Sequence, residues 1–115
     1  MNKNIALLLL SGGEGKRFSN NIPKQFYKIN EITILETNII KFLSFKLFSN
    51  LVVVSSKKNL SKTEVLCKKY NVDNNIKVIE GGETRQKSSK FGCLFLKKYN
   101  PDIVLIHDVA RPFVN

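Results

Sequence analysis

Four short apolar runs alternate with stretches of helical periodicity, and this alternation limits the possible folds more than any other feature of the chain. The runs are Asn4–Leu10, Leu51–Val54, Ile76–Ile79 and Ile103–Ile106. Such continuous apolar runs are typical of strands that are buried on both faces of a parallel sheet. Because strands that alternate with helices form βαβ units, the pattern predicts an α/β fold: an open, mainly parallel sheet with helices on both faces.

Three helices are expected between these strands. Their expected ranges are about 34–46, 61–70 and 84–99. Thr33 and Ser61 each stand three residues before a glutamate, which is the pattern of a capping box at the start of a helix. The third helix would carry Phe91, Leu94 and Phe95 on one side.

Composition and charge narrow the class of partner. The chain has 115 residues and a formal net charge of +10, and 43% of its residues are hydrophobic. The hydrophobic share excludes intrinsic disorder, and the length suits one small domain or part of a larger one. The lysines are scattered, whereas a nucleic-acid groove needs basic residues interleaved with aromatic residues on one face. We therefore expect a small anionic substrate and no nucleic acid; a steep salt dependence would reveal the nucleic-acid alternative.

A membrane span, a structural metal site and a disulfide scaffold are not expected. The longest apolar run, Ile5–Leu10, is far shorter than the roughly 18 residues that cross a bilayer. No small-residue cleavage site follows it, so a secretory signal fits poorly and we expect a cytoplasmic protein. Cys67 and Cys93 are isolated and His107 is the single histidine, so the usual ligands of a zinc site are missing. We expect both cysteines to be free thiols in the core or near the surface.

Three polar segments mark where a ligand would bind. Ser11–Arg17 follows the first strand, Gly81–Gln86 the third and His107–Pro112 the fourth. Parallel strands end at the same edge of their sheet, and open α/β sheets bind ligands at that edge, where the strand order reverses. If the strands lie in the order 3-2-1-4, the first and the last of these segments face each other across the site.

The glycine-rich segment after the first strand can cradle phosphate, because glycine lets backbone N–H groups approach an anion closely. Lys16 and Arg17 add positive charge. Two familiar motifs do not fit: Leu10 stands in place of the first glycine of a P-loop, and Phe18 in place of the last glycine of a dinucleotide fingerprint. A tight turn without a ligand is the alternative interpretation of this segment.

Several further side chains are candidates for the chemistry. Pro23 fixes the backbone before Lys24, which is either a phosphate contact or a solvated surface lysine. Asp108 follows an apolar strand, where a carboxylate either holds Mg²⁺ together with phosphates or braces a loop. Arg111 would pair with Asp108 or with a phosphate. For His107 we expect a hydrogen-bonded structural role rather than that of a general base.

Four motifs in series resemble one enzyme family. They are L-S-G-G-E-G-K-R-F at 10–18, P-K-Q-F at 23–26, G-G-x-x-R-Q-x-S at 81–88 and H-D-x-A-R-P-F at 107–113. Their order and spacing resemble those of the 2-C-methyl-D-erythritol 4-phosphate cytidylyltransferases, with the ribitol-5-phosphate cytidylyltransferases as close relatives. The resemblance implies a Rossmann-like fold of the nucleotide-diphospho-sugar transferase type. It covers the N-terminal half of such an enzyme, so we interpret residues 1–115 as the N-terminal nucleotide-binding part of a single nucleotidyltransferase domain that continues beyond them.

The resemblance also implies a reaction, in which CTP and 2-C-methyl-D-erythritol 4-phosphate give 4-diphosphocytidyl-2-C-methyl-D-erythritol and pyrophosphate in non-mevalonate isoprenoid synthesis. Arg17 and Lys24 would be the catalytic residues that steady the negative charge on the CTP phosphates. Asp108 would hold Mg²⁺. The residues implied to bind the substrates are Ser11, Gly12, Gly13, Glu14, Gly15, Lys16, Gly82, Arg85, Ser88, Ala110 and Arg111. A homodimer is implied for the full-length protein.

Two alternatives to this interpretation stay open. The family often has A-A-G where this chain has Ser11-Gly12-Gly13, and the G-G form recurs in the ribitol-phosphate branch, so ribitol 5-phosphate is an alternative acceptor. Arg85 and Ser88, in R-Q-x-S, lean towards the methylerythritol branch. The family's second acidic ligand and its dimer-forming arm belong to the later half, so a fragment that binds nucleotide without turnover is the other alternative.

Overall fold

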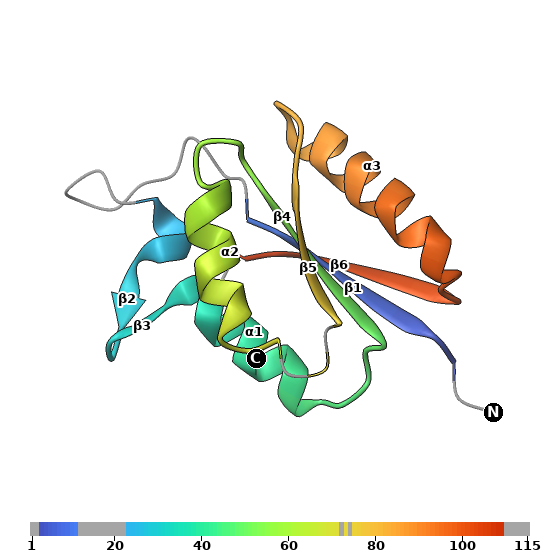
Figure 1. Ribbon diagram of the computed structural model, residues 1–115, viewed down its shortest axis with the longest axis horizontal. Coiled ribbons are helices and arrows are strands. Elements are labelled where there is room, and N and C mark those ends of the chain that lie inside the picture. Colours follow the sequence, from blue (N-terminus) through green and yellow to red (C-terminus); the bar gives the residue numbers. More distant parts are fainter. Residues whose placement is uncertain (1–2, 12–22, 72, 74, 110–115) are drawn as a thin grey trace.

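A four-stranded parallel sheet forms the centre of the protein (Figure 1). The computed structural model describes residues 3–11, 23–71, 73 and 75–109. The strands lie in the order β5-β4-β1-β6, with bounds β1 Ile5–Leu10, β4 Asn50–Ser55, β5 Ile76–Glu80 and β6 Ile103–Asp108. This is the order 3-2-1-4 that was considered above as a condition, and in it the first and fourth strands are neighbours. Leu10 pairs in register with Asp108, so β1 and β6 end side by side.

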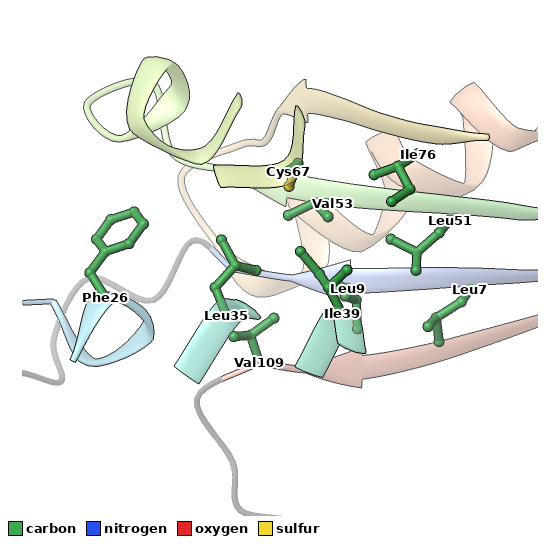
Figure 2. Packing of buried hydrophobic residues seen from close by; sticks show 10 residues of the cluster. All are labelled: Leu7, Leu9, Phe26, Leu35, Ile39, Leu51, Val53, Cys67, Ile76 and Val109. Carbon is green, nitrogen blue, oxygen red and sulfur yellow. The ribbon is translucent and has the colours of Figure 1, made fainter. Parts of the chain in front are cut away.

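Helices cover both faces of this sheet, as predicted. The helices α1 (Ile34–Ser44) and α2 (Leu60–Lys68) lie on one face, and α3 (Arg85–Leu96), extended by the 3₁₀ turn η3 (Lys97–Tyr99), lies on the other (Figure 1). Alternate strand residues point to opposite faces. Those facing α1 and α2 include Leu7, Leu9, Leu51 and Val53 (Figure 2), and those facing α3 are Ala6, Leu8, Leu10, Val52 and Val54. Burial on both faces explains why β1 and β4 are almost uniformly apolar.

The start of α1 is fixed by the capping box that the sequence predicted. The Glu36 N–H donates to the Thr33 hydroxyl at 3.1 Å, and the Thr33 N–H donates to Glu36 Oε1 at 3.2 Å. The buried Glu36 carboxylate also accepts a hydrogen bond from the Tyr70 hydroxyl at 2.6 Å. Burial by itself raises the pKa of Glu36, but its hydrogen bonds outweigh burial and the pKa is lowered. The same bond raises the pKa of Tyr70 to about 12.

We expect Tyr70→Phe to lower the free energy of unfolding by about 1–3 kcal/mol near neutral pH, because Glu36 then stays buried with one hydrogen bond fewer. The folded-state pKa of Glu36 is lowered, so its bonds stabilise the fold above its usual pKa of 4.5 and lose this effect as the pH falls through the folded value. The difference between wild type and variant should therefore shrink on acidification. It should shrink again above pH 10.0, because Tyr70 then ionises in the unfolded chain but ionises only at about 12 in the folded protein.

Urea unfolding at a series of pH values measures this difference. Tyr99→Phe is the matched control, because the Tyr99 ring packs against Phe95, away from Glu36. A difference that stays constant from about pH 3 to about pH 11 would contradict the linkage between these two groups.

The helix α2 begins one residue earlier than expected, and its predicted capping box is wrong. Asn59 is the N-cap residue and Leu60 begins the helix, without a side-chain cap hydrogen bond. The buried Thr63 hydroxyl instead donates to the Asn59 carbonyl at 2.8 Å, and it lies 3.2 Å from the Ser55 hydroxyl. This contact with the end of β4 fixes the first turn, and Ser61, the expected cap, lies inside the helix.

The side of α3 that meets the sheet coincides only in part with the apolar side that the sequence suggested. The buried residues of the helix are Ser88, Gly92 and Leu96. Phe91 and Leu94 are 43% and 54% exposed. A Cβ atom at Gly92 would lie 2.3 Å from Leu8 Cδ1, so glycine lets α3 approach β1 this closely. Small residues therefore make the closest contact, and Leu96 and the partly buried Phe95 pack against the same core. Of the three apolar residues expected on one side, Phe95 lies toward the sheet and Phe91 and Leu94 do not.

The sequence pattern gives no sign of a short hairpin before α1. It follows the 3₁₀ turn η2 (Lys24–Phe26) and consists of β2 (Lys28–Ile29) paired antiparallel with β3 (Ile32–Thr33). Asn30 and Glu31 form the two-residue turn with φ angles of 54° and 69°. Positive φ at both positions is the geometry of a type I′ turn, whose usual sequence is Asn-Gly. Because glutamate stands at the second position in place of the usual glycine, the sequence does not indicate this turn.

Candidate functional site

The carboxyl ends of the parallel strands meet at one edge of the sheet, where the sequence placed the site. Three backbone hydrogen bonds close this edge: Ser11 N–H to the Val54 carbonyl at 2.8 Å, Gly81 N–H to the Ser55 carbonyl at 2.8 Å, and Val109 N–H to the Leu10 carbonyl at 3.0 Å. We call this edge, marked by Ser11, Gly81 and Val109, the rim. The loops of the site leave the sheet from fixed positions along it.

Arg85 and Asp108 lie together at the rim, and the sequence predicted both as site residues. Arg85 Nε lies 3.0 Å from Asp108 Oδ1 and 3.1 Å from Oδ2. The pair joins the first residue of α3 to the last residue of β6, with 56% of the Arg85 side chain and 19% of the Asp108 side chain exposed. Solvent weakens a pair of this kind, so a more highly charged ligand can compete for either member. The sequence had suggested Arg111 as a partner of Asp108, and Arg111 lies outside the described residues.

Ser88 closes the turn that leads from β5 to α3. Its hydroxyl accepts a hydrogen bond from the Gly82 N–H at 3.1 Å and lies 3.4 Å from the Gly82 carbonyl, to which it donates. A Cβ atom at Gly81 would lie 2.4 Å from Ser88 Oγ and 2.6 Å from Val54 Cγ1, so the close approach requires glycine there. Gly82 and Ser88, which the resemblance assigned to nucleotide binding, are therefore in contact with each other at the rim.

The P-K-Q-F motif lies against the end of β1. Lys24 is half-buried, and the next residue, Gln25, is buried. The Gln25 Nε2 donates to the Ser11 carbonyl at 2.8 Å. This bond ties the turn that carries Lys24 to the residue at which the glycine-rich segment begins. Sequence reasoning assigned a role to Lys24 and none to Gln25.

Asn38 is a second residue of the rim that sequence reasoning did not find. It lies in α1, is buried, and its Nδ2 donates to the Val109 carbonyl at 3.1 Å. The two residues are 71 positions apart, so no local motif connects them. His107, next to Asp108, lies with its ring edge-on to Phe42 at a centroid distance of 5.2 Å, a contact that suits a structural side chain.

The remaining predicted site residues lie outside the part of the chain that the structure describes. They are Gly12, Gly13, Glu14, Gly15, Lys16, Arg17, Ala110 and Arg111. Their roles stay predictions of the resemblance. In the sequence they follow Ser11 and Val109, and the described rim fixes where both segments leave the sheet.

The cysteines behave as predicted. Cys67 is buried in the core between α2 and the sheet, and Cys93 is exposed; both are free. Burial, followed by the nearby Glu36 and Glu64 charges, raises the pKa of Cys67 to about 12. In the described ranges of the chain, no helix has both the length and the apolar character needed to cross a membrane.

Comparison with known proteins identifies the family. A sequence model of 2-C-methyl-D-erythritol 4-phosphate cytidylyltransferase, IspD, matches residues 5–115. The chain belongs to the IspD family. The cytidylyltransferase of Thermosipho africanus is 46% identical over 113 residues, which are 96% of this chain and 49% of the relative. That of Leptospira borgpetersenii serovar Hardjo-bovis is 41% identical over 114 residues, 99% of this chain and 48% of the relative. The chain therefore spans about half the length of these curated relatives.

Solved structures of the IspD family confirm the predicted fold class. The 4-diphosphocytidyl-2C-methyl-D-erythritol synthase of Anaerococcus prevotii matches with a TM-score of 0.75 at 25% identity, covering 98% of this chain and 46% of that one. The bifunctional IspDF of Campylobacter jejuni matches with a TM-score of 0.73 at 28% identity, covering 97% of this chain and 27% of that one. The mainly parallel sheet with helices on both faces is shared with these proteins.

Proposed function

We propose that this chain is the CTP-binding part of an enzyme that transfers the cytidylyl group of CTP to 2-C-methyl-D-erythritol 4-phosphate. The observation that carries the proposal is the arrangement of the rim in a chain of the IspD family. The turn bearing Lys24, the start of α3 with Arg85 and the end of β6 with Asp108 are far apart in sequence, yet they supply charged groups to one edge of the sheet.

The proposed reaction asks for positioning and charge rather than covalent chemistry by the protein. An oxygen of the acceptor phosphate attacks the α-phosphorus of CTP, a new P–O bond forms, and the bond to the β-phosphate breaks so that pyrophosphate leaves. Charge stabilisation by fixed groups dominates transfers of this kind. Lys24, and Arg17 by its place in the family motif, would supply positive charge, and the glycine backbone after Ser11 would supply N–H groups.

Asp108 suits a magnesium ion that is shared with the CTP phosphates. Among the described residues, no group of three or more His, Cys, Asp or Glu side chains could hold a metal ion with protein side chains alone. Mg²⁺ commonly takes one or two protein carboxylates and completes its shell with water and substrate phosphates, which a single, partly exposed carboxylate at a strand end permits. The ion, when bound, would neutralise phosphate charge. Arg85 would hold the carboxylate in place before the nucleotide arrives.

The proposal is tested by pyrophosphate release from CTP, using the protein expressed from its complete reading frame. We expect 2-C-methyl-D-erythritol 4-phosphate to be preferred over ribitol 5-phosphate. The Ser11-Gly12-Gly13 sequence is the observation that makes ribitol 5-phosphate the second candidate acceptor. No release with either acceptor would contradict the proposal. Gel filtration of the same protein tests the homodimer, and fractionation of the source cells tests the cytoplasmic location, both of which we include in the proposal.

Measurements of CTP binding and nucleic-acid binding by the 115-residue chain alone distinguish two remaining possibilities. Saturable CTP binding without turnover would identify it as a nucleotide-binding fragment. Binding to nucleic acid that falls steeply with salt, without CTP binding, would identify a basic nucleic-acid binder and contradict the proposal.

A further inference from the structure

Two buried side-chain amides hold the backbone at the rim, and neither has a role in the function proposed above. Gln25 is 2% exposed, and its Nε2 donates to the Ser11 carbonyl at 2.8 Å. Asn38 is 1% exposed, and its Nδ2 donates to the Val109 carbonyl at 3.1 Å and to the Ile34 carbonyl at 2.8 Å. Ser11 directly follows β1 and Val109 directly follows β6. Each amide therefore fixes the point where a loop of the site leaves the sheet.

Both amides belong to one continuous segment, 23–44, which contains η2, the hairpin and α1. Between their two acceptors, the Val109 N–H donates to the Leu10 carbonyl at 3.0 Å. Figure 2 shows Val109 near Leu35 and Ile39 of α1, so apolar packing supports the same contact. A chain of hydrogen bonds thus runs from η2 through the ends of β1 and β6 to α1.

Stability alone explains Asn38 poorly. Asn38 Oδ1 is buried and has no hydrogen-bond partner in the described part of the chain. An unmet buried acceptor costs free energy that an apolar side chain of similar volume avoids. The amides fix the backbone next to two charged residues. Gln25 directly follows Lys24, and Val109, whose carbonyl accepts the bond from Asn38, directly follows Asp108. Their bonds hold Lys24 and Asp108 relative to each other through the backbone.

We propose that Gln25 and Asn38 are positioning residues for the cytidylyl transfer. They fix the backbone beside Lys24 and Asp108 before the substrates arrive, so that both charges meet the CTP phosphates without reorganisation. This inference rests on the proposed function, because a positioning role has a meaning only if the protein carries out that reaction. A displacement of about 1 Å at such a group can cost about 10²-fold in rate, so the main effect falls on kcat rather than on folding.

The test compares Gln25→Met and Asn38→Leu with the wild type in the complete protein, measuring kcat, the KM for CTP and Tm. Both replacements keep the approximate volume of the side chain and remove the donor. We expect kcat to fall about 10- to 100-fold while Tm changes by a few degrees at most. Ile76→Val is the control: Ile76 is a buried core residue at the start of β5, at the end of the strand opposite to the rim, so the variant should lower Tm and leave kcat unchanged.

Wild-type kcat in folded Gln25→Met and Asn38→Leu would overturn the inference. So would an equal loss of kcat in Ile76→Val, because the loss of kcat would then follow the loss of stability. If either variant does not fold, Gln25→Leu and Asn38→Val take their place; failure of all four to fold would show that the amides serve the core alone and would also overturn it. A wild-type protein that releases no pyrophosphate contradicts the proposed function itself, and the inference with it, so the two failures are distinguishable.

Discussion

Asp108→Asn is expected to abolish cytidylyl transfer and to leave CTP binding nearly independent of Mg²⁺. Asp108 pairs in register with Leu10, so its carboxylate lies beside the end of β1, where the glycine-rich segment begins. A carboxylate and a phosphate about 4 Å apart repel by about 4 kcal/mol at an effective dielectric constant near 20. A divalent cation between them makes the interaction favourable. Wild-type CTP binding should therefore require Mg²⁺, whereas asparagine keeps the shape, removes the charge and removes that requirement.

CTP titrations of folded wild type and Asp108→Asn, with and without Mg²⁺, measure this effect. Arg85→Gln is the matched control, because it breaks the same ion pair and keeps the carboxylate. CTP binding by Arg85→Gln should stay dependent on Mg²⁺ even if its affinity falls. An unchanged Mg²⁺ dependence in Asp108→Asn would make Asp108 a brace for the start of α3 and would place the metal elsewhere.

Burial on both faces made the central sheet predictable, because it leaves a continuous apolar run for each strand. The hairpin β2–β3 has no such run: its strands have two residues each, and Asn30-Glu31 lacks the glycine that marks a type I′ turn. The closest contact between α3 and the sheet could not be predicted for a different reason. Gly92 meets Leu8 because glycine has no side chain, and hydrophobic periodicity detects large residues.

Contacts between distant residues set the limit of prediction at the site. Motif spacing located Lys24, Arg85 and Asp108, but it did not give their partners. The Arg85–Asp108 pair spans 23 positions, and no local pattern selects Arg85 over Arg111 as the partner of Asp108. Gln25 belongs to a recognisable motif, yet its bond to Ser11 depends on where η2 packs against β1. The charged groups can thus be predicted from the sequence, whereas the contacts that hold them in place come from the tertiary structure.

Lys24→Ala should leave the fold intact and lower the rate of transfer by about 10²-fold or more. The turn that carries Lys24 is held by other groups: the Phe26 N–H donates to the Pro23 carbonyl at 2.9 Å, and Gln25 is bonded to Ser11. The core residue of this turn is Phe26, so truncation of Lys24 removes no core side chain. Under the proposed function, the variant would lose a positive charge from the turn at the end of β1, where negative charge would build on the CTP phosphates in the transition state.

The measurement is kcat and the KM for CTP in the complete protein, with circular dichroism and Tm to verify folding. Lys62→Ala is the control, because Lys62 Nζ lies 4.4 Å from the centre of the Phe26 ring, so its truncation removes a lysine from the same region while the four residues of the P-K-Q-F motif stay unchanged. Lys24→Arg keeps the charge and should recover part of the lost rate. Near-normal turnover in well-folded Lys24→Ala would mean that Lys24 is a surface lysine and that other residues of the rim supply the charge at the phosphates.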